Sequence, residues 1–181
     1  VCSYLDLSSQ DKLAQVLSLN FDYGLNQVFC GLHVGAEIHF SAFHFPKDLF
    51  AFIRSNEITT LALMPIFLNR TFDARYFTRA FVQNIASLKR ITTSGGRVSR
   101  DIINSITDAL PDTDLYLMYG LTEAFRSTFL HPSQIRHRPE SIGKAIPEVE
   151  IMVVNEKNQK CPVNEPGELV HRGGVIAKGY W

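Results

Sequence analysis

Two polar stretches of this sequence have residue types that could hold a phosphate and a metal ion. The first is TSGGR at 93–97, and the second is YGLTE at 119–123. Paired glycines let a backbone approach a ligand closely and present free N–H groups, while a hydroxyl beside a carboxylate offers oxygen atoms to a phosphate and to Mg²⁺. A simpler interpretation is open for each stretch: the glycines form a tight turn, and the hydroxyl and carboxylate cap the next helix.

Several better-defined motifs are absent from the sequence. Neither stretch fits G-x-x-x-x-G-K-[ST] or G-x-G-x-x-G, so no P-loop or dinucleotide site is predicted. There is no G-x-S-x-G elbow, which leaves a serine hydrolase unsupported. His33, His39 and His44 lack metal-ligand spacing and are expected to be structural. Three arginines could reach phosphates, although isolated arginines on polar loops are usually solvated: Arg97, Arg126 and Arg136.

The elements that must position the two stretches alternate between strands and helices. Apolar runs predict strands at 15–19, 36–40, 59–64, 89–94 and 115–119. Helices are predicted at 22–35, 46–57, 65–72 and 99–110, two of them opened by a proline and the last capped by a serine. This alternation indicates an α/β fold, a mostly parallel sheet flanked by helices. Both polar stretches then follow the carboxyl ends of strands, where open parallel sheets bind ligands.

The first predicted helix has a clear apolar periodicity. Four apolar residues fall at i, i+3, i+4 and i+7, which places them on one helical face: Leu25, Val28, Phe29 and Leu32. Asp22 is placed to cap the N-terminus of this helix, and Gly35 is placed to end it.

The pattern changes near residue 141. Two apolar segments, 149–154 and 167–173, flank a polar turn with no helical pattern between them. We therefore expect an α/β subdomain over 1–140 and the start of a β subdomain over 141–181.

Composition limits the classes of function. The chain has 181 residues, 45% of them hydrophobic, with 18 basic and 18 acidic side chains. This balance disfavours binding to nucleic acid that depends on net charge. The three cysteines are widely spaced, which is typical of a reducing, cytoplasmic setting and not of a disulfide framework. No apolar run approaches the roughly 20 residues of a membrane span, and the first residues lack the pattern of a signal peptide.

Four motifs in order resemble the adenylate-forming (ANL) superfamily of AMP-dependent synthetases and ligases. MYGLTEA resembles its Y-G-x-T-E motif, and TTSGGRVS resembles its glycine-rich adenine-contacting turn. SIGKAIPEVEIMVV with NEPGELVHRGGVIAKGYW resembles a later run, and LSLNFDYGLNQVFCGLHVGAEI resembles the stretch lining the acyl or aminoacyl pocket. The resemblance covers nearly the whole chain. The segments FDYGLNQ and MYGLTEAFRST most resemble the corresponding segments of the acyl-CoA ligases found beside exosortase systems.

The resemblance implies an enzyme that activates a carboxylic acid with MgATP. The acid becomes an acyl-adenylate and passes to a thiol, either of CoA or of the phosphopantetheine arm of an acyl carrier protein. Thr122 and Glu123 are then the catalytic residues, with Thr122 on the α-phosphate and Glu123 on Mg²⁺. The nucleotide-binding residues are Thr122 together with Gly95, Gly96, Arg97, Tyr119 and Gly120. Arg97 replaces the small residue that many members carry there, and Tyr119 could instead be a strand aromatic that closes the sheet.

The expected substrate pocket is formed by Asp22, Tyr23 and Gly24. Phe21-Asp22 resembles a pair in amino-acid adenylation domains whose aspartate receives the substrate ammonium, although the same aspartate could serve only as a helix cap. Gly24 is expected to leave room for the substrate.

Two other readings are open: an amino-acid adenylation domain, and a catalytically dead binding or scaffold module. The family's lysine-bearing phosphate loop, its ribose-binding aspartate and its C-terminal domain have no counterpart here. We therefore expect an internal fragment of a longer enzyme, inactive by itself.

Overall fold

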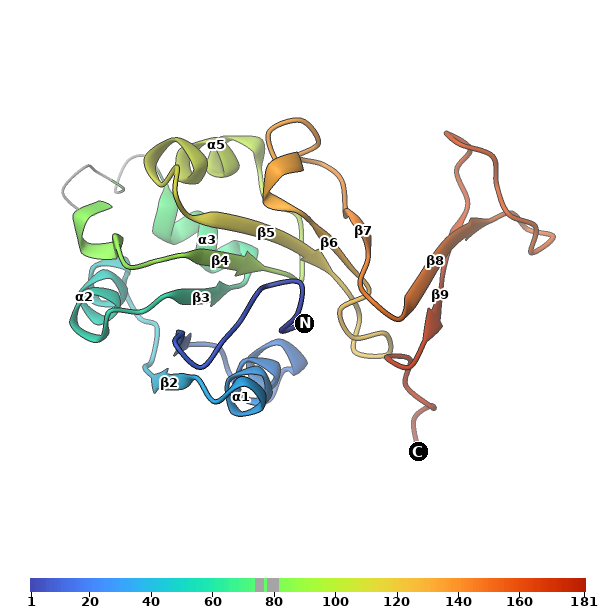
Figure 1. Cartoon of the computed structure of the whole chain (residues 1–181). Coiled ribbons are helices and arrows are strands. Elements are labelled where there is room, and N and C mark those ends of the chain that lie inside the picture. Colours follow the sequence, from blue (N-terminus) through green and yellow to red (C-terminus); the bar gives the residue numbers. More distant parts are fainter. Residues whose placement is uncertain (74–76, 78–81) are drawn as a thin grey trace.

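A seven-stranded sheet forms the centre of the molecule in the computed structural model, which describes residues 1–73, 77 and 82–181 (Figure 1). The strand order is β2-β1-β3-β4-β5-β6-β7. The parallel strands are β1 (Lys12–Gln15), β2 (Glu37–Phe40), β3 (Thr60–Leu63), β4 (Arg90–Thr93) and β5 (Asp114–Tyr119). Two antiparallel strands complete the sheet, β6 (Thr128–Leu130) and β7 (Lys144–Ala145). The predicted α/β class with a mostly parallel sheet is confirmed.

The helices begin where local sequence signals place them. They are α1 (Asp22–Val34), α2 (Pro46–Asn56), α3 (Pro65–Phe72) and α5 (Arg100–Ala109), with single 3₁₀ turns η1 (Gln83–Ile85) and η2 (Pro132–Gln134). A proline occupies the first turn of α2 and of α3, where its missing N–H has no helical partner. Ser99 caps α5, its hydroxyl accepting a hydrogen bond from the Ile102 backbone N–H at 3.4 Å.

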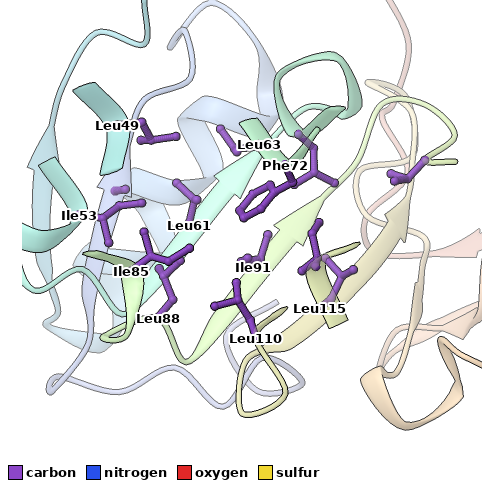
Figure 2. Packing of buried hydrophobic residues seen from close by; sticks show 14 of the residues in the cluster. Leu49, Ile53, Leu61, Leu63, Phe72, Ile85, Leu88, Ile91, Leu110 and Leu115 are labelled. Carbon is purple, nitrogen blue, oxygen red and sulfur yellow. The ribbon is translucent and has the colours of Figure 1, made fainter. Parts of the chain in front are cut away.

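The sheet carries a hydrophobic core on each face, as alternation along the strands requires. Leu61, Leu63 and Leu115 join the larger core with the buried faces of α2, α3 and α5, and Figure 2 shows this packing. The neighbouring residues Ala62 and Tyr116 point to the other face, where the second core lies. The prediction that helices cover both faces is therefore confirmed.

The second core lies on the α1 side of the sheet. It joins Tyr23 of α1 to the N-terminal Leu5 and to Met118 and Phe129 of the sheet. The Tyr4 ring stacks on Phe129 with ring centroids 4.3 Å apart. This core reaches the ends of β5 and β6, so it supports the loops that follow β4 and β5.

The strand predicted at 15–19 was placed too late. The strand runs over Lys12–Gln15, so the predicted and observed ranges overlap only at Gln15. The chain leaves the ladder after Gln15, whose side-chain Nε2 donates to the Leu17 carbonyl at 2.6 Å. Leu17 is apolar because it packs into the second core from outside the sheet. The short strands β6 and β7 were not predicted.

Helix α1 buries a different face from the one its large apolar residues define. Leu25, Phe29 and Leu32 are 39%, 58% and 69% exposed. The buried face consists of Tyr23, Gly24, Gln27, Cys30 and Gly31. A Cβ on Gly31 would lie 2.6 Å from Cγ1 of Ile38, so small residues allow α1 to pack closely on β2.

The termini of α1 agree only in part with the prediction. Gly35 ends the helix in a left-handed conformation, φ 72°, as predicted. The N-cap is Phe21, however, and Asp22 is the first helical residue. Asp22 is therefore not the N-cap that the spacing indicated.

An ion pair links β4 to the segment before β1 at the end of the sheet opposite to the predicted site. Asp11 and Arg90 are 1% and 8% exposed, and Asp11 Oδ1 lies 2.7 Å from Arg90 Nη1. Burial raises the pKa of Asp11, but hydrogen bonds from Ser8 N and Thr59 Oγ1 and the nearby guanidinium outweigh it and lower the pKa overall. This network ties β4 to the segment that precedes β1.

The C-terminal part forms an antiparallel hairpin of β8 (Val149–Val154) and β9 (Glu168–Gly173), which projects from the sheet (Figure 1). The predicted β-only segment is confirmed, although β7 still belongs to the large sheet. A division into subdomains at 140/141 remains a prediction. Among residues 1–73, 77 and 82–181, no helix has both the length and the apolar character to cross a membrane.

Candidate functional site

The polar stretches after β4 and β5 lie side by side, because these strands are neighbours in the sheet. A cavity of about 360 Å³ opens where they meet the start of α1. Six of the predicted site residues line it: Asp22, Tyr23, Gly95, Gly120, Thr122 and Glu123. The fold therefore brings two of the three expected substrate residues and the expected catalytic pair to one place.

A second cavity of about 540 Å³ adjoins the first. Gly96, Arg97 and Tyr119 line it, and Gly95 and Gly120 line both cavities. Tyr119 is half-buried, with its ring centroid 6.0 Å from that of His171. The two polar stretches thus form a partition between two hollows, an arrangement that suits two reactants that must meet.

Glycine is needed at Gly95 and at Gly120 for different physical reasons. Gly95 has φ +87°, a conformation that favours glycine, and no atom lies within 4 Å of where its Cβ would be. A Cβ on Gly120 would lie 2.5 Å from the Arg126 backbone nitrogen, so Gly120 is required by the close return of its own loop. Only Gly95 leaves open space of the kind expected for ligand approach.

Thr122 and Glu123 do not cap a helix. They are exposed in a loop that leads from β5 to β6, so the simpler interpretation of this stretch is wrong. The C-terminal segment folds back onto the loop: Ala177 N donates to the Glu123 carbonyl at 2.7 Å, and Tyr180 Oη donates to Glu123 Oε1 at 2.6 Å. The Tyr180 hydrogen bond lowers the pKa of Glu123 and raises that of the phenol. Sequence reasoning missed this role for Tyr180.

Glu123 is a suitable ligand for Mg²⁺ at this position. Among the residues that the structure describes, no group of three His, Cys, Asp or Glu side chains could hold a metal ion on its own. Mg²⁺ usually takes one or two carboxylates and completes its shell with water and substrate phosphates. A single exposed carboxylate beside a hydroxyl fits that mode.

Asp22 lies in the first turn of α1, at the edge of the smaller cavity. Its Oδ1 accepts a hydrogen bond from the Tyr23 backbone N–H at 2.8 Å. Gly24 does not line either cavity, and a Cβ there would meet the Ser18 carbonyl oxygen at 2.1 Å. The prediction that Gly24 makes room for substrate is therefore wrong, because its missing side chain makes room for the backbone before α1.

Tyr23 forms the buried wall of the same cavity. Its hydroxyl shares a 2.8 Å hydrogen bond with Thr92 Oγ1, and burial raises its pKa to about 12 despite the nearby Arg126 guanidinium. The phenol is therefore neutral at physiological pH, and its hydroxyl is hydrogen-bonded to Thr92.

Arg126 is the functional candidate that sequence reasoning missed. It was expected to be solvated, yet it is 2% exposed and lines the cavity with Asp22. Its guanidinium carbon lies 3.9 Å from the Tyr23 ring centroid. Two other arginines of polar loops are exposed and paired, Arg97 with Glu140 at 2.6 Å and Arg136 with Asp108 at 2.7 Å. No local pattern marks Arg126, since its burial depends on residues distant in sequence.

Comparison with known proteins identifies relatives over the whole chain. Tyrocidine synthase 1 of Brevibacillus parabrevis is 29% identical over 97% of this chain. Delta-poly-L-ornithine synthetase of Acinetobacter baumannii is 30% identical over 98% of it. The chain spans only 16% and 13% of these two proteins.

A solved structure shares the fold. O-succinylbenzoate coenzyme A synthetase from Bacillus subtilis, in complex with ATP and magnesium, matches 99% of this chain with a TM-score of 0.85 at 20% identity. This chain covers 36% of that structure. The family model described as AMP-binding enzyme matches residues 1–181. The chain therefore belongs to the AMP-binding enzyme family.

Proposed function

We propose that the complete protein activates an amino acid with MgATP and passes it to a thiol. The observation that carries this proposal is that Asp22 and the Thr122-Glu123 pair line one cavity of about 360 Å³. A carboxylate at its edge can receive an ammonium group while the substrate carboxylate reaches the hydroxyl and metal ligand. The name of one relative, delta-poly-L-ornithine synthetase, refers to a polymer of the amino acid ornithine, which supports the same hypothesis.

The proposed chemistry makes a poor acyl donor reactive. An oxygen of the substrate carboxylate attacks the α-phosphorus of ATP, a new P–O bond forms, and the bond to pyrophosphate breaks. Thr122 donates a hydrogen bond to an α-phosphate oxygen, and Glu123 holds Mg²⁺. The ion supplies positive charge against the phosphate oxygens. These groups lower the barrier by positioning and by charge compensation.

The nucleotide is proposed to occupy the larger cavity. Tyr119 lies on its wall and offers a ring face to adenine, and Gly95 lets the backbone approach the ring. Gly96 lines the same cavity beside it. Arg97 also lines this cavity, and its Nη2 is paired with Glu140, which leaves its other N–H groups for the nucleotide. Gly120 separates the nucleotide from the acid.

A second candidate function is activation of an acid without an amino group, as in acyl-CoA ligases. The hydrogen bond from Tyr23 N to Asp22 favours it, because Asp22 then has a structural role that needs no ligand. The thiol acceptor is proposed to be the phosphopantetheine of a carrier protein in the first case and CoA in the second.

ATP–pyrophosphate exchange by the complete protein tests the proposal. Matched pairs that differ only in the amino group, such as norleucine and hexanoate, separate the two functions. We expect exchange with amino acids only, reduced about 100-fold or more in Asp22→Asn, because an uncompensated ammonium costs several kcal/mol. Glu123→Gln should abolish exchange, and the surface variant Asp108→Asn should leave it unchanged. Equal exchange with hexanoate would support the acyl-CoA ligase, and no exchange with any acid would favour a binding module.

A further inference from the structure

Arg126 is a buried cation without a polar partner among the residues that the structure describes. Its side-chain Nε and Nη2 are enclosed and form no hydrogen bond. Burying a guanidinium normally requires an anion or several acceptors, because the charge loses its hydration. Among the described residues, no carboxylate forms an ion pair with Arg126. An unsatisfied buried group of this kind calls for an explanation in a native protein, and a ligand that completes its hydrogen bonds is one.

The surroundings of Arg126 hold the guanidinium in place without satisfying it. It lies over the Tyr23 ring at 3.9 Å and near the Phe125 ring at 4.8 Å, contacts that leave N–H groups free. The nearby hydroxyls are already engaged: Tyr23 bonds Thr92, and Tyr4 donates to Met118 Sδ at 3.2 Å. Within the described part of the chain no hydrogen bond engages these N–H groups, and Arg126 lines the cavity, so they remain for a ligand there.

The backbone at Arg126 is also strained. Its φ is +54°, a left-handed conformation that is unfavourable for a residue with a side chain. The tight return of the loop against Gly120 holds it there. Strained positions of this kind persist where the surrounding structure requires one direction of a side chain.

The position of Arg126 decides which anion it can serve. All four residues line the cavity, but Thr122 and Glu123 are exposed, whereas Arg126 and Tyr23 are buried. We infer that the first pair lies at the rim of the cavity and the second pair at its floor. The carboxylate that reacts with ATP must be at the rim, beside Thr122. The floor therefore receives the other end of the substrate.

We propose that Arg126 binds a second carboxylate on the substrate, so that the substrate class is an amino dicarboxylic acid. This inference rests on the proposed function. The ammonium is received by Asp22, the reacting carboxylate lies at Thr122, and the second carboxylate meets the guanidinium, whose planar fork matches two carboxylate oxygens. Arg126 is thus the residue that determines specificity for charge.

Acids and their isosteric amides test this assignment in the complete protein. In pyrophosphate exchange we expect kcat/KM to favour glutamate over glutamine, or aspartate over asparagine, by at least about tenfold, because an amide cannot replace the charge on a buried guanidinium. Arg126→Met should reduce that ratio to near one, and Arg126→Lys should give an intermediate ratio. The control Arg136→Met removes an exposed, paired arginine and should leave the ratio unchanged.

The wild-type measurement alone can overturn the inference, even if the variants do not fold. Equal or better use of the amides would do so. Calorimetric binding of the same four ligands to the complete protein separates this outcome from failure of the proposed function. Tighter binding of an acid than of its amide, lost in Arg126→Met, would support a carboxylate subsite even without exchange. Equal binding, or no binding of any of the four, would reject it.

Discussion

Replacing Gly120 by alanine should damage the site with little effect on the rest of the fold. The added Cβ would lie 2.5 Å from the Arg126 backbone nitrogen, 3.0 Å from its Cα and 3.2 Å from the Ala124 carbonyl oxygen. All three atoms belong to the backbone, so no side chain can rotate to relieve the contact. The loop itself must move.

The size of that movement sets the expected effect. Ordinary contacts of a Cβ begin at about 3.4 Å, so one side of the loop must shift by about 1 Å. The loop carries Thr122, Glu123 and Arg126, which face the same cavity. A displacement of about 1 Å at reacting groups costs on the order of 100-fold in rate. We therefore expect Gly120→Ala to lower kcat/KM for pyrophosphate exchange by about 100-fold.

The assay compares this variant with Gly174→Ala in the complete protein. No atom lies within 4 Å of a Cβ at Gly174, so that control should keep wild-type activity. Melting temperatures of both variants separate loss of the site from loss of the fold. Activity of Gly120→Ala within about threefold of wild type, in a folded protein, would refute the argument that the loop return fixes the site.

Two further predictions concern charged groups. Asp11→Ala leaves Arg90 buried without its partner and should lower the free energy of unfolding in urea by about 3–5 kcal/mol, whereas Asp108→Ala, which breaks an exposed pair, should cost at most about 1 kcal/mol. A loss below about 1 kcal/mol for Asp11→Ala would contradict the first expectation. Tyr180→Phe should raise the pKa of Glu123 in a carboxyl NMR titration, because the hydrogen bond that lowers it is removed. Because the hydrogen bond lowers the pKa of Glu123, it stabilises the fold at pH values above the ordinary Glu pKa, and this stabilisation is lost as the pH falls through the lowered pKa. An unchanged pKa of Glu123 in Tyr180→Phe would contradict this expectation.

Local signals in the sequence placed most of the elements. Pro46, Pro65 and Ser99 act within one helical turn, so they fix where helices begin whatever the tertiary structure. The strand before α1 was misplaced because Leu17 is apolar for a contact outside the ladder. Apolar runs report burial, and burial alone does not distinguish a strand from a segment that packs beside it.

The site shows the same distinction between local and distant causes. The rule for carboxyl ends of parallel strands placed Gly95 and Glu123 together, because it depends only on strand order. Gly24 was misread because its close neighbour, the Ser18 carbonyl, is set by the approach of the chain to α1. Tyr180 reaches Glu123 across 57 residues, a contact that no periodicity indicates.

A buried arginine lies at each end of the sheet, and the two differ in whether a carboxylate pairs with them. At one end, the buried charge of Arg90 is completed by Asp11, and hydrogen bonds satisfy that carboxylate on both oxygens. At the other end, the buried guanidinium of Arg126 lies beside a cavity and has no carboxylate partner among the described residues. Burying either arginine costs desolvation free energy. Among the described residues, an ion pair offsets that cost only for Arg90. The contrast implies that the second recovers it from a ligand, so binding of an amino dicarboxylic acid should stabilise the protein against unfolding more than binding of its amide.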